Sequence, residues 1–352
     1  MLTAEHRVVL LQHGGLDHLR GKTGLAMLRH RPGPIVAVVD PDHAGCRLDQ
    51  VTGIQRAVPV VADLEAALAF DPEVAVVGLA PSGGQLPPAM RRDVRAALQA
   101  GLHLASGLHT RLADDQEFAA ARCPDRWIWD LRQEPPELSV GQAAAAALPC
   151  RRILAVGTDM AVGKMSACLE LLAAAERGRR RARFVGTGQA GILIAGEGVA
   201  LDAVRVDYAA GAVEAAVLRA GAGLAASDLV LIEGQGSLCH PASTATLPLI
   251  RGSQPTDLLL VHRAEQQSLD RVPEIPLPPL DELIAVTEAL AALARPQGRG
   301  PAPGVRGVAL NTARLCETEA QAAVQDLEQR LQLPCSDPVR WGGDDLLKAI
   351  PS

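Results

Sequence analysis

The sequence contains little lysine and few aromatic residues. Only three of its 34 lysine and arginine residues are lysine, and aromatic residues make up 2% of the 352-residue chain. Few stacking side chains and a net charge of −6 argue against nucleic-acid binding, which needs aromatic platforms and a basic surface. We expect a small-molecule substrate and no nucleic-acid partner.

The sequence also lacks membrane and disulfide signals. No run of about 18 apolar residues predicts a membrane span, and the N-terminal MLTAEHRVVLLQ does not resemble a signal peptide. The seven cysteines are scattered and none forms a C-x-x-C pair, which predicts reduced thiols, no metal site and a cytoplasmic location. Cys239 stands beside His240, but adjacent residues of an extended chain point to opposite faces, so a joint site is disfavoured.

Because lysine is scarce, its positions are informative. Lys22 and Lys164 each follow a glycine, and GTDMAVGK at 157–164 fits the pattern G-x-x-x-x-G-K. In such a loop the backbone N–H groups surround phosphate oxygens and the lysine ammonium reaches the outer phosphates. An apolar run at 152–156 precedes it and an Ala/Leu-rich, helix-like stretch at 165–176 follows. The strand–loop–helix context predicts a phosphate site made by Gly157, Thr158, Asp159, Gly163 and Lys164.

The residue after the lysine departs from the usual pattern. Met165 occupies the place where Ser or Thr normally binds magnesium, and Ser166 comes one position later. A thioether is a poor ligand for a hard cation. We therefore expect bound phosphate or pyrophosphate, and the sequence leaves Mg²⁺ binding and nucleotide hydrolysis open.

The N-terminal part alternates strand-like and helix-like runs, which predicts a parallel, doubly wound sheet. The expected strands are 7–12, 35–40, 58–61, 74–80 and 103–107, and the expected helices are 24–30, 63–70, 89–100 and 114–121. Asp40 ends the second strand, where dinucleotide folds keep an acid, yet the loop HGGLDHLRGKTG lacks G-x-G-x-x-G, so the NAD signal is weak. Residues 21–23 form either an anion site or a helix start with a solvated lysine.

Proline and alanine mark the boundary between two predicted α/β domains. We assign residues 1–135 to the first domain, 136–149 to a linker and 150–352 to the second. Further strands are expected at 182–185, 228–232, 258–262 and 305–311. The segment 263–279 contains four prolines and is predicted to be a long loop, serving as a lid or an oligomer contact. We expect a homo-oligomer.

Polar and glycine-rich clusters follow the strands of the second domain, at the edge where open α/β sheets bind ligands. Glu233 ends the run DLVLIE and is read as a general base or a water-mediated metal contact, with turn capping as the alternative. The small residues beside it let a ligand approach the backbone. The substrate-binding candidates in these clusters are Gly188, Gln189, Gln235 and Ser237.

Three further candidates have two readings each. Asp207 is either a base for a substrate amine or a helix-end charge, and His240 is either an acid/base or a residue bonded to backbone. Arg132 lies at the domain junction, where it would either bind a carboxylate or form a salt bridge between the domains.

Several motifs together resemble the D-glutamate N-acetyltransferase-like P-loop family. They are WDLR-x-x-PP, GTDMAVGKMS, TGQAGILIAGEGVALDAVRVD, YAAGAVE and EGQGSLCHPA, which span most of the chain. Methionine after the P-loop lysine is similar to the family pattern, whereas Ala190 replaces a threonine that is usual in TGQTG. The resemblance implies a Rossmann-like N-terminal domain, a C-terminal P-loop NTPase-like α/β domain, and acetyl transfer from acetyl-CoA to an acidic D-amino acid.

The second domain also resembles dethiobiotin synthetase, whose loop begins with a similar GTD-x-x-x-GK. That resemblance implies a different activity, the formation of an amide from a carboxylate with ATP and Mg²⁺, and an adenine contact at Asn311 in VALNT. Met165 at the magnesium position disfavours this alternative.

We therefore expect an acyltransferase with named roles for a few residues. Lys164 and the loop amides anchor the donor phosphates, and Glu233 or Asp207 removes the amine proton. Arg132 holds the substrate carboxylate, and backbone N–H groups of the glycine-rich turns stabilise the oxyanion.

Overall fold

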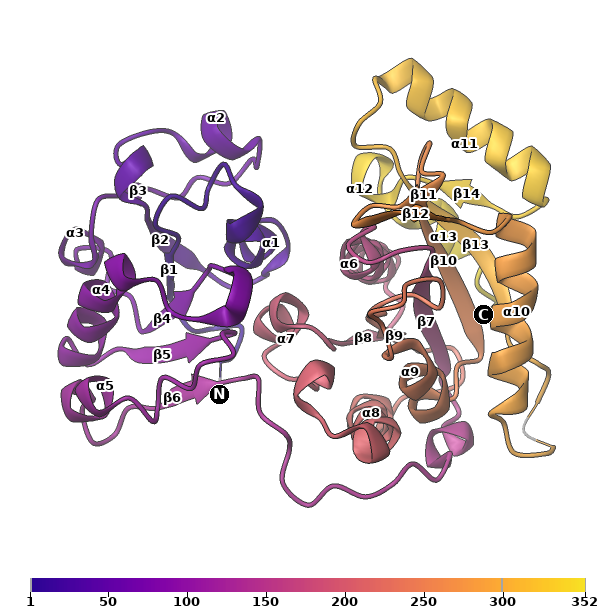
Figure 1. The fold of residues 1–352 in the computed structure, drawn as a ribbon, viewed down its shortest axis with the longest axis horizontal. Helices are drawn as coiled ribbons and strands as arrows, with labels where there is room; N and C mark the ends of the chain where they lie inside the picture. The colour runs from indigo at the N-terminus through magenta and orange to yellow at the C-terminus, as the bar shows by residue number, and fades with distance from the viewer. Residues whose placement is uncertain (1, 299, 352) are drawn as a thin grey trace. The chain divides into compact units, whose positions relative to one another are not determined.

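The computed structural model describes residues 2–298 and 300–351, which form two compact units (Figure 1). The first unit contains residues 1–134 together with 189–203, and the second contains 135–188 together with 204–352. Among the described residues, no helix combines the length and the apolar character needed to cross a bilayer. Each unit is described by itself below.

The first unit is built on a parallel six-stranded sheet, as its alternating sequence predicts. The strand order is β3-β2-β1-β4-β5-β6, the order of the Rossmann fold. The strands are β1 Val8–Leu11, β2 Ile35–Val39, β3 Val60–Val61, β4 Val74–Val77, β5 His103–Ser106 and β6 Ile128–Asp130. Nearly every residue of β1, β2 and β4 is fully buried, which is why these strands are continuous Val, Leu and Ala runs.

Helices cover both faces of this sheet. The helices are α1 Lys22–His30, α2 Leu48–Thr52, α3 Leu64–Leu68, α4 Pro88–Gln99 and α5 Gln116–Ala121. Residues of α3, α4 and α5 share one core with alternate residues of β1, namely Val9 and Leu11, while α1 lies on the other face (Figure 1). Four of these helices were predicted from sequence, whereas α2 and the edge strand β6 were missed because each is too short to show a clear period.

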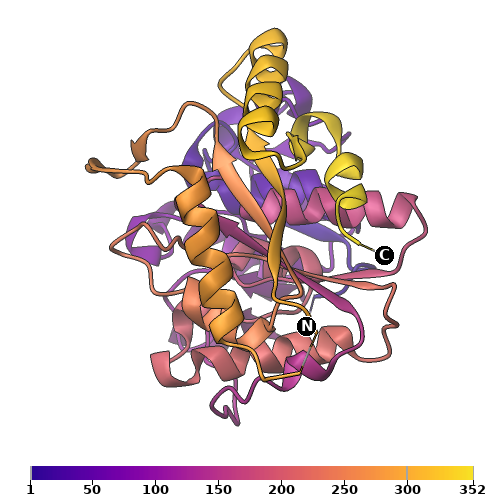
Figure 2. The same cartoon turned by 90° about the vertical axis from the view of Figure 1, so that its right-hand side faces the viewer.

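The second unit also contains a parallel six-stranded sheet, ordered β14-β13-β10-β7-β9-β8. Its strands are β7 Arg151–Gly157, β8 Ala182–Val185, β9 Leu229–Ile232, β10 Asp257–Arg263, β13 Gly304–Asn311 and β14 Cys335–Ser336. Five of the six follow the predicted runs, and only the two-residue β14 was not anticipated. Figure 2 shows β10 and β13 side by side at the centre of this unit.

The helices of the second unit fall into two groups that pack within themselves. One group is α6 Lys164–Arg177, α12 Pro338–Trp341 and α13 Asp344–Lys348, and the other is α8 Val206–Gly221, α9 Thr246–Ser253 and α10 Leu280–Leu293. The remaining helix, α11 Glu317–Leu331, packs beside β14. The cores are filled mainly by Ala, Val, Leu and Ile, as the low aromatic content requires.

The expectation that 263–279 is an irregular loop is wrong in part. β11 Ser268–Leu269 and β12 Val272–Pro276 pair antiparallel, with Leu269 opposite Val272 and Ser268 opposite Pro276. Proline is tolerated because a two-stranded ribbon has free edges that need no N–H donor. The four prolines led to the prediction of a loop where the chain forms a β-hairpin.

The segment 189–203 groups with the first unit, although it lies within the sequence range of the second domain. It contains α7 Gln189–Ala195, which packs against α1. The sequence analysis placed Gly188 and Gln189 in a glycine-rich cluster after a strand, and the structure shows that Gln189 begins this helix. The helix forms because Ile192, Leu193 and Ile194 are buried. The free energy of burying these side chains outweighs the low helix propensity of Gly191.

Candidate functional site

The predicted phosphate loop lies between β7 and α6, the strand–loop–helix arrangement that the motif requires. Ala161 and Gly163 have φ of 55° and 116°, and the latter is in a region that is open to glycine but strained for other residues. A side chain on Gly157 would come within 2.9 Å of Lys164 Nζ. The two motif glycines thus have separate purposes, one for the turn and one for space around the lysine.

Lys164 begins α6 and folds back onto its own loop. Its Nζ donates a hydrogen bond to the Asp159 carbonyl oxygen at 2.8 Å, and only 6% of the residue is exposed. Burial lowers the pKa of Lys164 to about 8, while the charges of Asp159 and Glu233 oppose that shift. A desolvated ammonium at a helix N-terminus is a strong attractor for a phosphate oxygen.

Glu233 follows β9 and is as deeply buried as the lysine. Its Oε2 accepts hydrogen bonds from the Thr187 N–H at 2.8 Å and the Gly188 N–H at 3.0 Å. Burial raises the pKa of Glu233 to about 7, although two backbone N–H groups and the Lys164 charge act in the opposite direction. A carboxylate that titrates near neutral pH is suited to proton transfer.

Two glycines keep the space around these charges open. A side chain on Gly234 would overlap the Ala155 carbonyl oxygen and come within 2.9 Å of Lys164 Cδ. One on Gly188 would lie 3.2 Å from Glu233 Oε1 and clash with the Gln235 amide. Gln235 is itself fixed, because its Nε2 donates to the Thr187 carbonyl oxygen at 2.7 Å.

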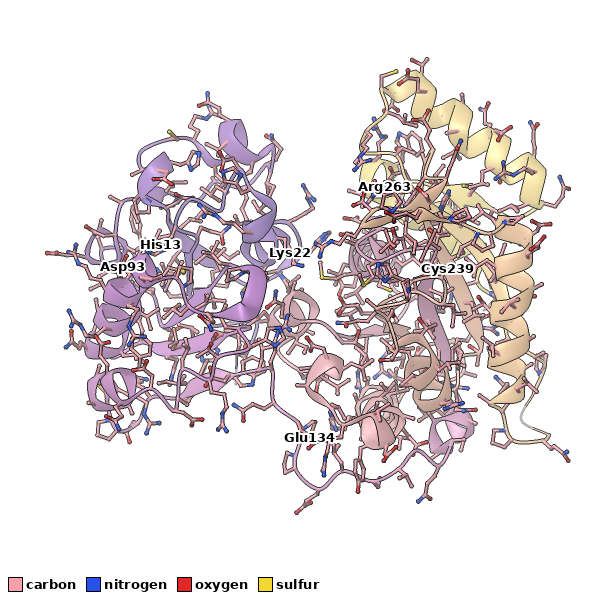
Figure 3. The ribbon with its side chains drawn as sticks, in the orientation of Figure 1. His13, Lys22, Asp93, Glu134, Cys239 and Arg263 are labelled. Atoms are coloured by element: carbon pink, nitrogen blue, oxygen red, sulfur yellow. The ribbon has the colours of Figure 1, made fainter. Side chains whose placement is uncertain are left out.

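The segment after Glu233 is joined to the phosphate loop. Ser237 is buried and its Oγ donates to the Thr158 carbonyl oxygen at 2.9 Å. His240, 5% exposed, accepts the Ala242 N–H on Nδ1 at 3.1 Å, and its buried Nε2 has no hydrogen-bond partner in the part of the chain that the structure describes. A buried Nε2 with no partner is a group that a ligand can satisfy. The neighbouring Cys239, labelled in Figure 3, is half-buried, and burial raises the pKa of its thiol, which disfavours a thiolate nucleophile.

Asp159 fastens the β11–β12 hairpin to the phosphate loop. Its Oδ2 accepts from Gln266 Nε2 at 2.6 Å and from the Asp270 N–H at 2.8 Å, while Oδ1 accepts from the Met160 N–H. The sequence pattern placed Asp159 in the loop but did not indicate that it holds the hairpin.

Arg263 is a second cation at this loop and was not predicted. It ends β10, is labelled in Figure 3, and donates from Nη2 to the Ala161 carbonyl oxygen at 3.2 Å. Its Nη1 lies 3.5 Å from Asp270 Oδ1 and the side chain is 12% exposed. Its position at the carboxyl end of a predicted central strand was the signal that could have identified it.

The remaining loop candidates have structural partners. Asn311 donates from Nδ2 to the Val162 carbonyl oxygen at 2.9 Å and accepts the Ala313 N–H, so its amide braces the loop from β13. Met165 and Ser166 lie half-buried in the first turn of α6. Thr158 Oγ1 lies 3.0 Å from Nδ1 of His262, whose pKa burial lowers to about 4, so this histidine is neutral.

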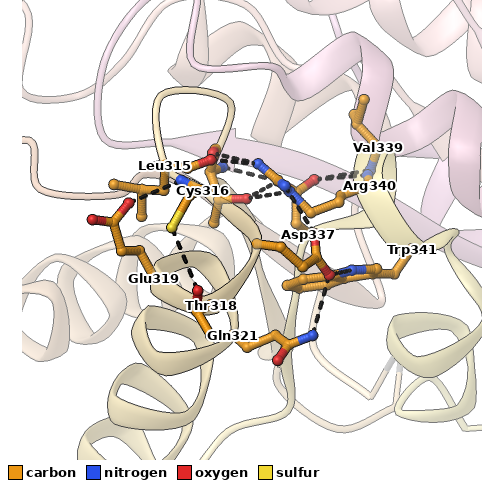
Figure 4. Close-up of polar contacts among 11 residues, drawn as sticks. Leu315, Cys316, Thr318, Glu319, Gln321, Asp337, Val339, Arg340 and Trp341 are labelled. Carbon is orange, nitrogen blue, oxygen red and sulfur yellow. Dashed lines mark hydrogen bonds and ion pairs between the residues drawn. The ribbon is translucent and has the colours of Figure 1, made fainter.

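A network around Arg340 holds the chain next to Asn311 (Figure 4). Arg340 donates to the carbonyl oxygens of Thr312 and Leu315 at 3.0 and 2.9 Å and to Glu317 Oε2 at 2.9 Å. The Thr312 N–H in turn donates to Asp337 at 2.9 Å. These bonds fix the carboxyl end of β13, from which Asn311 reaches the phosphate loop.

Two predicted site residues, Arg132 and Gln189, belong to the first unit, and a third, Asp207, lies in α8. Arg132 forms an ion pair with Asp202 and lies 2.8 Å from His109 Nε2, and all three residues belong to the first unit. Gln189, also in the first unit, begins α7. Asp207 is exposed in the first turn of α8, where a carboxylate complements the helix dipole.

The loop fits a phosphate-bearing ligand better than a metal ion. A phosphate would supply the negative charge that the buried Lys164 ammonium faces only in part. For Mg²⁺ the donor set fits poorly, because Met165 brings a thioether to the usual hydroxyl position.

The sequence matches two domains of one family. Residues 139–347 match the P-loop domain of DUF1611, a domain of unknown function, and residues 41–134 match its Rossmann-like domain. The chain is 51% identical to a DUF1611 family protein from Anabaena variabilis ATCC 29413, whose crystal structure superposes with a TM-score of 0.90 over 98% of this chain and 99% of that one.

Two relatives are named for an activity. A D-glutamate N-acetyltransferase of Tritonibacter scottomollicae is 34% identical over 336 residues, which is 95% of each chain. A D-glutamate N-acetyltransferase of a Pseudoalteromonas species is 32% identical over 274 residues, covering 77% of this chain and 79% of the other. The phosphate loop, the two domain matches and these relatives agree, and this chain belongs to the DUF1611 family of Rossmann-like and P-loop domains.

Proposed function

We propose that this protein is an N-acetyltransferase that transfers an acetyl group from acetyl-CoA to the amine of a small acidic D-amino acid such as D-glutamate. The observation that carries the proposal is the similarity to the Tritonibacter enzyme of that name, which extends over 95% of both chains and therefore over both domains. Acetyl-CoA supplies the activated thioester and brings phosphates to the loop. No resident metal ion is needed for this chemistry.

The residues of the second unit support this assignment through their charges. Lys164 and the N–H groups of the last loop residues before it, 161–163, attract and orient the donor phosphates at the start of α6. Arg263 already contacts the same loop and adds a second cation. A donor with several phosphates uses both.

Glu233 is the proposed base. As the nitrogen–carbon bond forms and the carbon–sulfur bond breaks, the amine nitrogen loses protons and the leaving thiolate gains one. With a pKa near 7, the Glu233 carboxyl is partly ionised at neutral pH and can accept such a proton. The proton that Glu233 accepts then passes to the leaving thiolate. His240, whose Nδ1 accepts the Ala242 N–H, carries its ring proton on Nε2, which has no partner among the described residues and is proposed to donate a hydrogen bond to the reacting group.

The test is an acetyl-transfer assay that follows CoA release with acetyl-CoA and a panel of amines, without added Mg²⁺ and with EDTA present. Acetylation of D-glutamate that exceeds that of L-glutamate and is insensitive to EDTA supports the proposal. The competing activity is an ATP-dependent ligase. ADP or AMP release that requires Mg²⁺, with no CoA release for any amine, would replace the acetyltransferase assignment with the ligase.

We also propose a cytoplasmic location for this reaction. All seven cysteines are free, and those at positions 150, 168 and 335 are buried, as expected of a chain that folds under reducing conditions.

A further inference from the structure

A histidine–aspartate pair lies at the carboxyl edge of the first sheet. His13 follows β1 by two residues, and its Nε2 lies 2.9 Å from Asp93 Oδ2 on α4 (Figure 3). The two side chains are only 7% and 9% exposed. The same alternation that places Val9 and Leu11 under α4 places His13 there, so the pair extends a row of core residues to the end of the sheet.

The pair leaves one ring nitrogen unused. Asp93 also accepts the Leu64 N–H on its other oxygen, so it acts as a fixed acceptor and holds the imidazole proton on Nε2. His13 Nδ1 is then a lone-pair acceptor that points away from Asp93, and it is buried without a hydrogen-bond partner among the described residues. Buried acceptors of this kind are uncommon unless a water or a ligand satisfies them.

The backbone of His13 is also unusual. Its φ of 41° is positive, a conformation that is uncommon outside glycine, although asparagine, aspartate and histidine adopt it more often than other residues. Such strain persists where the surrounding structure requires it and is frequent at ligand sites. Here it turns the chain into Gly14 directly after β1, at the point where the strand order changes direction between β1 and β4. Open parallel sheets bind ligands at this switch point.

Other buried polar atoms along the same edge also have no hydrogen-bond partner among the described residues, and two of them lie beyond β5 and β6. Gln189 Oε1 packs against Gly107, just after β5, and is buried without a partner. Arg132 follows β6, and its Nε is likewise buried without a partner among the described residues, while its Nη1 pairs with Asp202. His13 Nδ1 and Gln189 Oε1 are acceptors that suit an ammonium group, and Arg132 Nε is a donor that suits a carboxylate. The end of β1 is roughly 10 Å from the end of β5 and roughly 15 Å from the end of β6, a span that an extended amino acid covers together with its hydrogen bonds and the side chains that meet it.

We infer that the carboxyl edge of the first sheet is a binding site for a small amino acid, and that His13, positioned by Asp93, recognises its amine. The identity of this amino acid as the acetyl acceptor rests on the proposed function. The site itself is argued only from residues of the first unit. No covalent step is assigned to it.

The experiment uses two substitutions of His13 that test the roles of its Nδ1 and Nε2 atoms one at a time. In His13→Gln the side-chain amide can keep the bond to Asp93 but loses the acceptor at the Nδ1 position. In His13→Asn the carbonyl oxygen lies near the Nδ1 position, the Asp93 bond is lost, and the positive φ is well tolerated. His103→Gln, at the opposite end of β5, is the matched control.

Binding of D-glutamate and of glutarate, which lacks the amine, is measured by calorimetry on the full-length protein without an acetyl donor. We expect wild type to prefer D-glutamate, His13→Gln to lose about tenfold to a hundredfold in D-glutamate affinity with little change for glutarate, and His13→Asn and the control to retain the preference. Thermal unfolding checks that each variant is folded.

Three results would overturn the inference. They are wild-type affinity in His13→Gln, a larger loss in His13→Asn than in His13→Gln, and no binding of D-glutamate by wild type. Failure of the proposed function is distinguishable, because acetyl transfer is assayed separately. If His13→Gln acetylates D-glutamate efficiently with unchanged KM, the acetyltransferase function is supported and the proposed amino-acid site at His13 is wrong.

Discussion

The two units share the same first strand–loop–helix arrangement, but the lysine that begins the helix has a different environment in each. In each, the first strand leads through a glycine-containing loop into a helix whose first residue is a lysine after a glycine, Lys22 in α1 and Lys164 in α6. Lys164 is buried and turned back onto its loop, whereas Lys22 is exposed. The same dipeptide at the same place in the fold therefore has two environments.

The two loops differ in which groups accept hydrogen bonds from their backbone N–H groups. In the first unit the fully buried Asp40 accepts from the Gly14 N–H at 2.8 Å and the Leu16 N–H at 3.3 Å. The Gln12 amide bonds to the Gly21 carbonyl oxygen and fills the space beneath the loop. A protein carboxylate thus takes the position of an anion there, while the second unit offers a shorter loop and a buried cation. An external phosphate is expected in the second unit only.

The largest expected effect is that of removing the second-unit lysine. Lys164→Ala should lower kcat/KM for the acyl donor about 10²- to 10³-fold, because a desolvated charge-assisted contact to phosphate is lost. Steady-state kinetics with varied acetyl-CoA measures this, with Lys22→Ala as the matched control at the equivalent position. Equal losses in both variants would show that the two loops do not differ as described.

The next comparison is between two buried carboxylates. Glu233→Gln should lower kcat about 100-fold, because an amide cannot accept a proton. Asp130 of the first unit also accepts two backbone N–H groups, from Leu112 and Ala113, and burial raises its pKa as well, so Asp130→Asn is a control for a purely structural carboxylate. It should cost stability and leave kcat unchanged.

The pH profile sharpens this assignment. A base with a pKa of about 7 must be ionised, so kcat/KM should rise with pH through about 7, and it should fall through about 8 as Lys164 loses its proton. The residual activity of Glu233→Gln should lack the lower limb. Persistence of that limb would assign the base to another group.

Arg263 is expected to contribute less. Arg263→Ala should raise KM for acetyl-CoA about three- to tenfold with little change in kcat, because the guanidinium lies near the loop rather than inside it. The exposed Arg271 of the same hairpin provides the control variant. A donor without phosphates, such as acetyl-pantetheine, should show no difference between the two, and a difference there would contradict a phosphate contact.

The smallest kinetic effect is expected at Asp40. Asp40→Asn should reduce the free energy of unfolding by about 1–3 kcal/mol, because loop N–H groups lose a charged acceptor, while KM for acetyl-CoA stays unchanged. Urea denaturation and donor kinetics measure the two quantities. A changed donor KM would indicate that the first loop takes part in donor binding.

The sequence anticipated what depends on short stretches of chain. Most strands were predicted because buried parallel strands are continuous apolar runs, and the phosphate loop because its turn is set by glycines at fixed spacing. The hairpin at 268–276 was missed because proline argued against strands, and α7 because it begins in a glycine-rich cluster. In both places burial outweighed local preference.

The sequence by itself determined the α/β class, the position of the phosphate loop with Lys164, and the placing of Glu233 at the end of a strand, since these depend on local periodicity and spacing. The tertiary structure decided that β7 and β9, which are not consecutive in the chain, are neighbours in the sheet. Only the tertiary structure decided the partners of Arg132, His13 and Asp159, which lie 70, 80 and 107 residues away along the chain. No local pattern encodes such pairs, because they form only when packing of the apolar faces brings the distant segments together.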